Sequence, residues 1–280
     1  MKRCNKKLYR LIEYIHHKLK FYVKKFLLTA GINIEIINNV EQVDQFFQMI
    51  KPVSTIFGLR RIGGDGDGGY LLPNDLVGIA ACFSPGVAFS SSFELQIAEM
   101  GIACHMADYS VDGPAQHHKL FTFDKKFLGA SNSGNFIRLD TWINFHKQGE
   151  GDLLLQMDIE GGEYDVILST PLEILEKFRI IVVEFHYLES LITVAGGKLV
   201  SLAFTKLLEI FEIVHIHPNN CRDPIKYKNY TIPPIMEFTF MRKDRVRISK
   251  EEFIAPNPLD RPCDPSRKNF NLPNCWYKKF

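Results

Sequence analysis

The stretch Leu153-Leu154-Leu155-Gln156-Met157-Asp158-Ile159-Glu160-Gly161-Gly162 joins an apolar run to an acidic turn that contains two glycines. A short apolar run bounded by turn residues is typical of a strand buried on both faces. The glycines let the backbone turn sharply directly after the run. We therefore predict a buried strand over residues 153–157, with polar groups gathered at its carboxyl end.

Similar apolar runs lie on both sides of this stretch and alternate with helical patterns. Such alternation gives a mainly parallel sheet with helices on both faces and right-handed crossovers. The sequence therefore predicts an α/β, Rossmann-like fold, with its sheet over about residues 79–243. The expected strands cover residues 79–83, 102–107, 120–123, 153–157, 179–183, 213–216 and 235–241. The expected helices cover 40–49, 91–100, 140–147 (with Asp140 as its N-cap), 171–177 and 199–211.

The two ends of the chain differ from this central pattern. Residues 1–30 form a basic amphipathic helix: apolar residues recur at steps of three and four, and Glu13 is the one acid among many lysines and arginines. Such a helix binds an anionic membrane surface, or packs its apolar stripe on the domain or on a partner. Residues 31–243 form the α/β domain, and residues 244–280 form an irregular proline-rich tail.

Composition narrows the function further. Among 280 residues, 46% are hydrophobic, 24% are charged and the net charge is +2, which argues against a nucleic-acid partner. No run reaches the roughly 18 apolar residues of a membrane span, and no apolar signal core follows the N-terminus. The six cysteines form no Cys-x-x-Cys pair, so the spacing indicates neither a disulfide framework nor a zinc site. Cys221, Cys263 and Cys275 share the C-terminal region, and a metal site there is kept as the less favoured alternative. We expect a cytoplasmic protein, with membrane contact at the inner surface if residues 1–30 provide it.

In an open α/β sheet, ligands bind outside the carboxyl ends of the strands. Gly86 follows the first expected strand, but the later glycines of a dinucleotide fingerprint are missing. A pyrophosphate cradle is therefore incomplete, whereas a nucleoside without pyrophosphate needs only one close backbone approach. Asp108 ends the next strand, at about the spacing where an acid binds a ribose diol. These two residues favour S-adenosylmethionine as the cofactor.

Chemistry-bearing side chains follow the later strands. His186 is the candidate general base, because the pKa of histidine lies near neutrality, and Glu184 shares its face of the strand. Asp158 and Glu160 could hold a divalent cation, orient a substrate hydroxyl or face the cofactor's sulfonium. Glu163 and Asp165 are expected to be solvated in the first turn of a helix. His217 competes for the role of base, and Asn219 and Asn220 are expected to hydrogen-bond a polyhydroxyl substrate.

Four motifs, in order and spacing, resemble the FkbM-type methyltransferase family over about residues 55–243. They are Arg61-Ile62-Gly63 through Asp67-Gly68-Gly69-Tyr70; Phe83-Ser84-Pro85-Gly86-Val87 with Ser92-Phe93-Glu94; Met157-Asp158-Ile159-Glu160-Gly161-Gly162-Glu163-Tyr164; and Val183-Glu184-Phe185-His186. The third motif is the most specific of the four.

This resemblance implies a class I S-adenosylmethionine-dependent fold and O-methylation, often of a sugar hydroxyl in a glycan or glycosylated metabolite. The cofactor residues are then Asp67, Gly68, Gly86, Glu94, Asp108 and Asp158, and the catalytic residues are His186, Glu184 and Glu160. The chain departs from the family where a small residue and an acidic or amide residue often stand, at Ala88 and Phe89. The alternative function is a non-catalytic module of the same fold that docks to a membrane or a protein.

Overall fold

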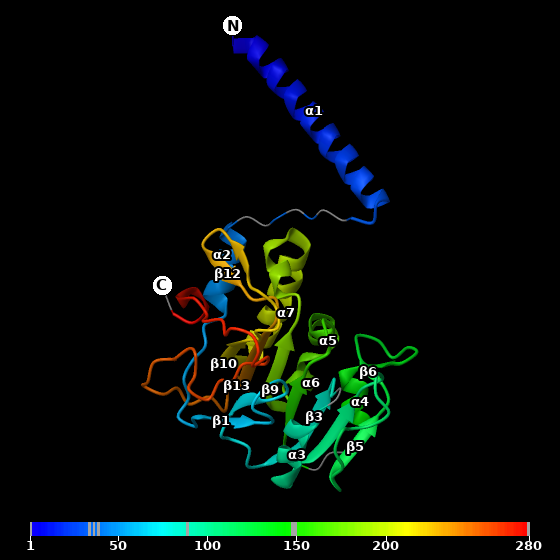
Figure 1. The fold of residues 1–280 in the computed structure, drawn as a ribbon, viewed down its shortest axis with the longest axis vertical. Coiled ribbons are helices and arrows are strands. Elements are labelled where there is room, and N and C mark those ends of the chain that lie inside the picture. Colours follow the sequence, from blue (N-terminus) through cyan, green and yellow to red (C-terminus); the bar gives the residue numbers. More distant parts are fainter. Residues whose placement is uncertain are drawn as a thin grey trace. The chain divides into compact units, whose positions relative to one another are not determined.

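The computed structural model describes residues 2–32, 35, 37, 40–87, 90–146 and 150–278, with side chains from Glu13 onward. Ala88 and Phe89, where the sequence departs from the family, lie outside the described residues. The chain divides into two compact units, Met1–Ile37 and Asn38–Phe280. The first unit consists of helix α1 (Lys2–Thr29) and the residues after it (Figure 1). None of the described helices has the length and apolar character needed to cross a bilayer.

A seven-stranded sheet forms the centre of the second unit, with the strand order β10-β13-β9-β8-β3-β4-β5. Six strands run parallel to one another, and β13 is antiparallel to both of its neighbours. The predicted Rossmann-like fold with a mainly parallel sheet is therefore confirmed. The strands are β3 (Ile79–Pro85), β4 (Ala103–Ala107), β5 (Phe121–Asp124), β8 (Asp152–Met157), β9 (Phe178–Phe185), β10 (Phe211–Pro218) and β13 (Met236–Arg242).

In the part of the chain that the structure describes, three short pairs of strands lie outside the central sheet, and only residues 70–72 among them show an extended pattern in the sequence. They are β1 (Leu59–Ile62) with β2 (Tyr70–Pro73), β6 (Phe127–Leu128) with β7 (Phe136–Ile137), and β11 (Ile225–Tyr227) with β12 (Tyr230–Ile232). Such short strands carry too few residues for a period of two to stand out. The β1–β2 pair encloses the glycine-rich turn, where Arg61 donates hydrogen bonds to the carbonyl oxygens of Gly64 and Gly66.

The helices of the second unit lie close to their predicted positions, with two differences. The helix expected from Leu199 begins at Val194, because Thr193 caps it by accepting a hydrogen bond from the Gly196 amide at 3.0 Å. Asp140 is not an N-cap, because it lies inside its helix and pairs with Arg138. The helices are α2 (Val40–Met49), α3 (Ser92–Glu99), α4 (Leu139–Phe145), α5 (Glu163–Ser169), α6 (Leu172–Leu175), α7 (Val194–Ile210), and the 3₁₀ helices η1 (Leu188–Ile192) and η2 (Asn274–Trp276).

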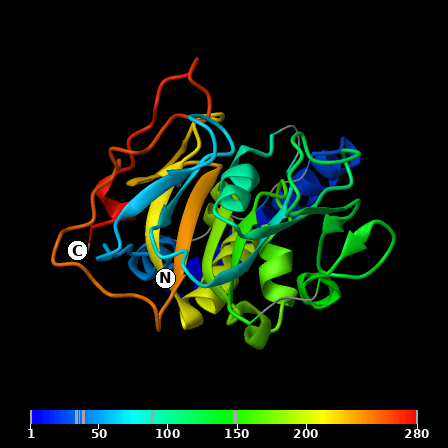
Figure 2. The ribbon, with the colours of Figure 1, turned by 90° about the horizontal axis from the view of Figure 1, so that it is seen from below.

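Both faces of the sheet are covered, as Figures 1 and 2 show. Leu154 faces one apolar cluster, which it shares with residues of α3 and of the β1–β2 pair. Its neighbours Leu153 and Leu155 face the other cluster, which contains residues of α2, α4, α5 and α7. Side chains alternate between the faces of a strand, so a strand buried on both faces needs apolar residues throughout. This burial explains the unbroken leucine run.

The order of the strands places the crevice of the sheet between β3 and β8. From β3 the chain builds β4 and β5 on one side, and it then crosses back to build β8 on the other side. Loops that leave two neighbouring strands in opposite directions open a crevice at their carboxyl ends. This switch point lies at Gly86 and Asp158, the residues that directly follow β3 and β8.

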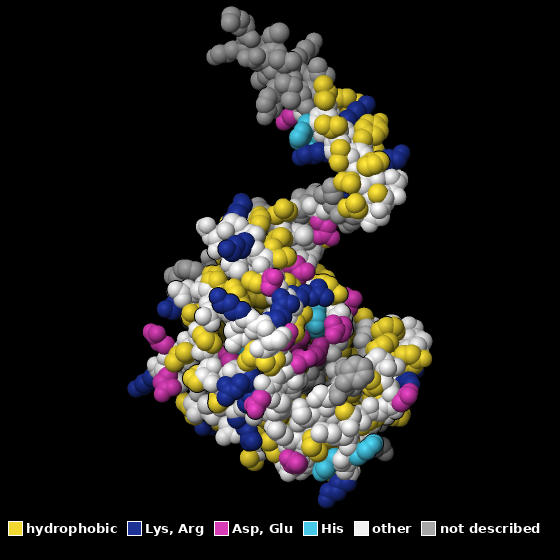
Figure 3. Space-filling model, viewed as in Figure 1, with side chains coloured by type: hydrophobic (Ala, Val, Ile, Leu, Met, Phe, Trp, Pro, Cys, Tyr) yellow, Lys and Arg dark blue, Asp and Glu magenta, His cyan; other side chains and the backbone are white. Residues whose placement is uncertain are grey.

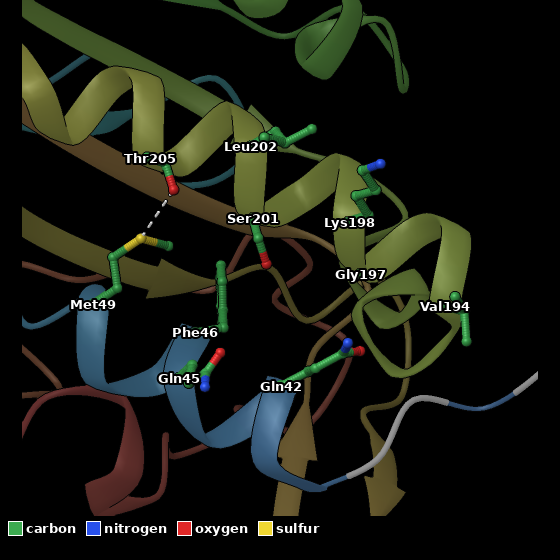
Figure 4. A pocket seen from close by; sticks show the side chains of 10 residues that line it. All are labelled: Gln42, Gln45, Phe46, Met49, Val194, Gly197, Lys198, Ser201, Leu202 and Thr205. Atoms are coloured by element: carbon green, nitrogen blue, oxygen red, sulfur yellow. Dashed lines mark hydrogen bonds between the residues drawn. The ribbon is translucent and has the colours of Figure 1, made fainter.

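A groove of about 410 Å³ lies between α2 and α7, and Figure 4 shows the side chains that line it. Thr205 on α7 donates a hydrogen bond across it to the sulfur of Met49 on α2, at 3.4 Å. Its walls consist of apolar, amide and hydroxyl side chains, with one lysine, Lys198. None of the site residues predicted from the sequence lines this groove.

The C-terminal tail packs on the second unit. Its described residues, 244–278, add no strand to the central sheet and contain η2. Trp276 is fully buried and donates a hydrogen bond from Nε1 to the carbonyl oxygen of Thr231 at 3.0 Å. Lys51 donates to the carbonyl oxygen of Cys275 at 2.6 Å. The tail is therefore fixed by burial and by hydrogen bonds despite its irregular backbone.

Candidate active site

Gly86 brings the two central strands into close contact at the switch point. Its φ of +83° lies in the left-handed region that favours glycine. A Cβ atom at this position would overlap the carbonyl oxygen of Asp158. The Gly86 amide also donates to the carbonyl oxygen of Ala107 at 3.0 Å, which ties the turn to β4. A glycine is therefore required here by geometry.

Two cavities meet at this contact, because Gly86 and Asp158 line both of them. The larger cavity has a volume of about 500 Å³, and Asp108, Phe127 and Phe136 also line it. The smaller has a volume of about 230 Å³, and its lining includes residues of the glycine-rich turn and of α3. Every predicted cofactor residue lines at least one of them, namely Asp67, Gly68, Gly86, Glu94, Asp108 and Asp158.

Asp108 stands at the carboxyl end of β4 with 5% of its surface exposed. Its Oδ1 accepts hydrogen bonds from the Ser110 amide at 2.8 Å and from the Ser110 hydroxyl at 2.6 Å. These bonds fix the orientation of the carboxylate at the edge of the larger cavity. A preoriented acid of this kind is suited to two neighbouring hydroxyl groups.

A buried polar network underlies the smaller cavity. Ser84 donates to Glu94, and it also lies 2.5 Å from Oε1 of Gln156. The amide of Gln156 donates to the hydroxyl of Tyr70 at 3.3 Å. Burial raises the pKa of Glu94 to about 7, although the hydrogen bond from Ser84 opposes the shift. The carboxyl group of Glu94, which has 3% of its surface exposed, therefore has a pKa near neutral pH.

The acidic turn after β8 has a strained and well-supported backbone. Glu160 has a φ of +56°, which is rare for a residue with a side chain, and Gly161 follows with +108°. Oε1 of Glu163 accepts hydrogen bonds from the amides of Ile159 at 3.2 Å and Gly161 at 3.0 Å. The side chain of Glu160 is 86% exposed and lines the larger cavity.

His186 lies at the centre of a group of carboxylates. Its Nδ1 donates to Oε1 of Glu163 at 3.1 Å, which fixes the tautomer of the neutral ring. Its Nε2 faces three further carboxylates: Glu160 at 3.4 Å, Glu184 at 3.5 Å and Asp158 at 3.9 Å. His186 and Glu184 line neither cavity, and Asp158 and Glu160 stand between them and the larger one.

The pKa values in this group reflect its burial and its excess of acids. Burial raises the pKa of Asp158 to about 7, with Glu160, Glu163 and Asp67 adding to the shift and His186 opposing it. Burial also holds the pKa of Glu184 well above its ordinary value. For His186, burial acts to lower the pKa, but the bonded Glu163 and the nearby acids outweigh it and raise that pKa. A cationic ligand would offset this excess of negative charge.

A divalent cation also fits part of this group. Asp158, Glu160 and His186 offer ligand atoms that lie within 4.8 Å of one another. Oδ1 of Asp158 is buried and has no hydrogen-bond partner, so it is available as an oxygen ligand. Glu163 would then support the histidine from its other nitrogen, as carboxylates commonly do behind a metal-bound imidazole.

The expectation that Glu163 is solvated is wrong. Its side chain is fully buried, and it orients His186 in addition to closing the turn. Asp165, in contrast, is exposed as expected. The helix dipole favours an acid in the first turn whether the side chain is buried or exposed. The sequence pattern therefore could not tell the buried Glu163 from the exposed Asp165.

Three other expectations about the rim need correction. Asn220 is not available to a substrate, because its amide donates to Asp264 and Arg267 of the tail and its oxygen accepts from the Asp264 amide. Asn219 donates to Oε1 of Glu184 at 3.2 Å instead of facing a cavity. His217 donates from Nε2 to the carbonyl oxygen of Arg261 at 2.9 Å and lines neither cavity.

One segment of the chain, which contains His186 and the carboxylates around it, matches a known protein family. Residues 131–215 match the model of the methyltransferase FkbM domain. The resemblance to the FkbM-type methyltransferases is confirmed for this segment, which contains the third and fourth motifs; the first two motifs lie before it. The FkbM match covers the strands and helices from β7 to α7 and most of β10, including Asp158, Glu160, Glu163, Glu184 and His186. Gly86 and Asp108 lie before it.

Among solved structures, two matches are crystal structures of magnesium protoporphyrin IX methyltransferase from Synechocystis PCC 6803. The structure with bound S-adenosylmethionine is 14% identical, covering 60% of this chain and 72% of that chain with a TM-score of 0.29. The structure with bound S-adenosylhomocysteine is 15% identical, covering 60% and 76% with a TM-score of 0.28. No curated protein matches the chain.

Proposed function

We propose that this chain is an S-adenosylmethionine-dependent O-methyltransferase whose acceptor is a hydroxyl group of a saccharide or of a glycosylated small molecule. The observation that carries the proposal is the pair of cavities that meet at Gly86 and Asp158, at the switch point of the sheet. The FkbM match supports the reaction class. The acceptor class rests on the family resemblance of the sequence motifs.

The two cavities divide the cofactor's recognition between them. Asp108 would accept hydrogen bonds from the ribose hydroxyls. Phe127 and Phe136, whose ring centroids are 5.6 Å apart, offer aromatic surface to the adenine. Asp67 and Glu94 in the smaller cavity would hold the ammonium end of the cofactor. When bound, the cofactor supplies an activated methyl group, and the nearby acids favour its positive sulfonium charge.

His186 and Glu163 would perform the proton chemistry. The hydrogen bond from Nδ1 to Glu163 leaves the Nε2 lone pair facing the acids beside the larger cavity. Glu160, which lines the larger cavity 3.4 Å from Nε2, would pass the proton of the acceptor hydroxyl to Nε2 as the oxygen–methyl bond forms and the methyl–sulfur bond breaks. The surrounding carboxylates favour the resulting imidazolium. Alignment of the hydroxyl with the methyl group would contribute the rest of the rate enhancement.

Asp108→Ala tests this assignment of the cofactor site. We expect isothermal titration calorimetry to show micromolar binding of S-adenosylmethionine to the wild type. In the variant, binding should be weaker by roughly 10- to 150-fold, because hydrogen bonds to a charged acceptor contribute about 1.5–3 kcal/mol. S-adenosylhomocysteine should show the same loss, since both ligands carry the ribose.

Asp112→Ala is the matched control, because Asp112 follows β4 in the same loop but its side chain is 95% exposed and pairs with Lys125. Its affinity for the cofactor should equal that of the wild type. Equal binding by Asp108→Ala and Asp112→Ala would remove Asp108 from the site. Folded wild-type protein that binds neither ligand, with or without a divalent metal, would favour the non-catalytic module instead.

A second proposal concerns α1, which we infer to bind anionic membrane surfaces. Within its own unit, most of the apolar side chains that the structure describes in α1 are exposed, from 46% for Val23 to 72% for Phe26. Figure 3 shows these hydrophobic side chains together with Lys side chains along the described part of the helix. Aromatic and aliphatic residues beside lysines are typical of helices that lie in the membrane interface. The occupant is therefore a bilayer with anionic headgroups.

Replacement of four lysines of α1 by glutamine should weaken binding to phosphatidylserine-containing vesicles by on the order of 10³-fold, since each basic residue contributes about 1 kcal/mol. Co-sedimentation at low salt measures this, and deletion of residues 1–30 should abolish it. The control replaces four exposed lysines of the second unit. Equal binding by the two quadruple variants would contradict the proposal. The lysines are Lys18, Lys20, Lys24 and Lys25 in α1, and Lys119, Lys228, Lys250 and Lys268 in the control.

A further inference from the structure

A second cluster of chemistry-bearing residues lies at the antiparallel part of the sheet, under the C-terminal tail. His217 on β10 is directly opposite Glu237 on β13. Cys263 of the tail lies close to both side chains, and its Sγ is 3.4 Å from Oε1 of Glu237. The ligand atoms of His217, Glu237 and Cys263 all lie within 4.8 Å of one another, and all three residues are buried.

The charges in this cluster are poorly balanced. Glu237 is opposite Glu184 on β9 as well as His217 on β10, and like charges directly opposite on neighbouring strands destabilise a sheet. Both glutamates are at most 5% exposed, so water does not screen them. The positive groups that act on Glu237 are His217, His215 and Arg61. The row of acids is therefore a place where a buried cation would be stabilising.

Two buried atoms lack hydrogen-bond partners, one in the cluster and one in the adjoining group of Asp67, Glu184 and Cys263. One is Oε2 of Glu184, whose side chain is 5% exposed and whose carboxylate lies within 4.8 Å of ligand atoms of Cys263 and Asp67. The other is Nδ1 of His217, whose side chain is 8% exposed. Its nearest carboxylate oxygen, Oδ2 of Asp260, is 3.5 Å away, too far for a well-formed hydrogen bond.

The other nitrogen of His217 is already held. Nε2 donates to the carbonyl oxygen of Arg261 at 2.9 Å, which leaves Nδ1 as the nitrogen for a metal ion, and binding there displaces any proton that Nδ1 carries. A hydrogen bond from the second nitrogen to a backbone carbonyl is the usual support of a metal-bound histidine. Asp260 in turn contacts both His217 and His215, at 3.5 Å and 2.9 Å, so the supporting segment is itself fixed.

We propose that His217, Glu237 and Cys263 bind a zinc ion, with Glu184 as the neighbouring carboxylate that completes a four-coordinate set. Nitrogen, oxygen and thiolate sulfur are the donors that zinc takes in proteins, and the sulfur selects against magnesium and calcium. The Cys263 thiol loses its proton to solvent as the zinc–sulfur bond forms. The ion would join the tail to β10 and β13, and it would do so whether or not the chain transfers methyl groups.

Metal content and a cobalt spectrum test this site in the full-length protein. Protein treated with Zn²⁺ and then desalted should contain about one zinc ion per chain by mass spectrometry. Cys263→Ser and Glu237→Gln should each lose most of it. Co²⁺ in place of zinc should give the absorption band of a thiolate bound to cobalt in the wild type, and Cys263→Ser should lack that band. Added Zn²⁺ should also raise the thermal midpoint of the wild type.

Cys221→Ser is the matched control, because Cys221 is an exposed thiol outside the three-residue cluster. It should keep both the zinc and the cobalt band. Full zinc content in Cys263→Ser, or loss of the cobalt band in Cys221→Ser, would overturn the proposal. If Cys263→Ser does not fold, the wild type decides alone, since a cobalt complex without a thiolate band contradicts a cysteine ligand.

Discussion

Gly86→Ala is expected to abolish measurable binding of S-adenosylmethionine and to destabilise the protein by about 4 kcal/mol or more. The new Cβ atom would overlap the carbonyl oxygen of Asp158, and both groups belong to the backbone of central strands or their ends. No side-chain rotation can relieve such an overlap, so β3 and β8 would have to separate where the two cavities meet. Urea denaturation and calorimetric titration measure the two effects.

Gly101→Ala separates the overlap from the strain of the backbone. Gly101 has a φ of +86°, close to the +83° of Gly86, but a Cβ atom there would meet nothing within 4 Å. This variant should lose only about 1–2 kcal/mol, the ordinary cost of a left-handed conformation for a residue with a side chain. It should bind the cofactor like the wild type. A Gly86→Ala protein that behaves like Gly101→Ala would show that the close approach is not needed.

His186→Ala should lower the rate of methyl transfer by about 10²- to 10⁴-fold, the usual contribution of a positioned general base. The dissociation constant of S-adenosylmethionine should stay within about twofold of the wild type, because His186 lines neither cavity. The rate is measured as S-adenosylhomocysteine formed with a saccharide acceptor at saturating cofactor.

Two further variants, one of the positioning residue and one neutral control, show whether the loss of rate is specific to the proton chemistry of His186. Glu163→Gln keeps the shape of the positioning residue but removes the charge that sets the tautomer of His186, so the turnover should fall here too. His117→Ala is the neutral control, because His117 is exposed in a loop. An unchanged rate in His186→Ala would place the base elsewhere. If chelators reduce the wild type to the rate of His186→Ala, the histidine acts as a metal ligand instead of a base.

The sequence predicted those parts of the fold whose cause is local. The run at 153–157 must be apolar on both faces, and the structure buries it on both faces. The carboxyl ends of the strands could be placed on one rim because parallel strands share their direction. The positions of Gly86 and Asp108 at the larger cavity could therefore be predicted from strand direction alone, without information on side-chain packing. The two-residue strands β6 and β7 depend on their pairing, and the early start of α7 depends on the cap by Thr193. Neither cause can be recognised from hydrophobic periodicity.

The rest of the site depends on contacts between distant segments. The sequence predicts a solvated Glu163 at the start of a helix, because its partner, His186, follows a strand 23 residues further along the chain. His217, Glu237 and Cys263 come from three separate parts of the chain, so none of the spacings typical of zinc sites is present. Asn220 has the residue type expected at a sugar site, but the tail occupies its hydrogen bonds. Residue type alone could not distinguish an amide available to a substrate from one whose hydrogen bonds are taken by another segment of the chain.

The position of β13 has a consequence for the order in which the protein is assembled. This strand is the last of the central sheet in the sequence, yet it lies between β9 and β10. A growing chain on the ribosome can pair β3, β4, β5, β8 and β9 early, but β10 has no neighbour in the sheet until residues 236–242 emerge. Loss of the last strand would therefore leave two unpaired edges instead of shortening one. Truncation before residue 236 should expose sheet edges prone to aggregation, so the end of the chain decides whether folding completes.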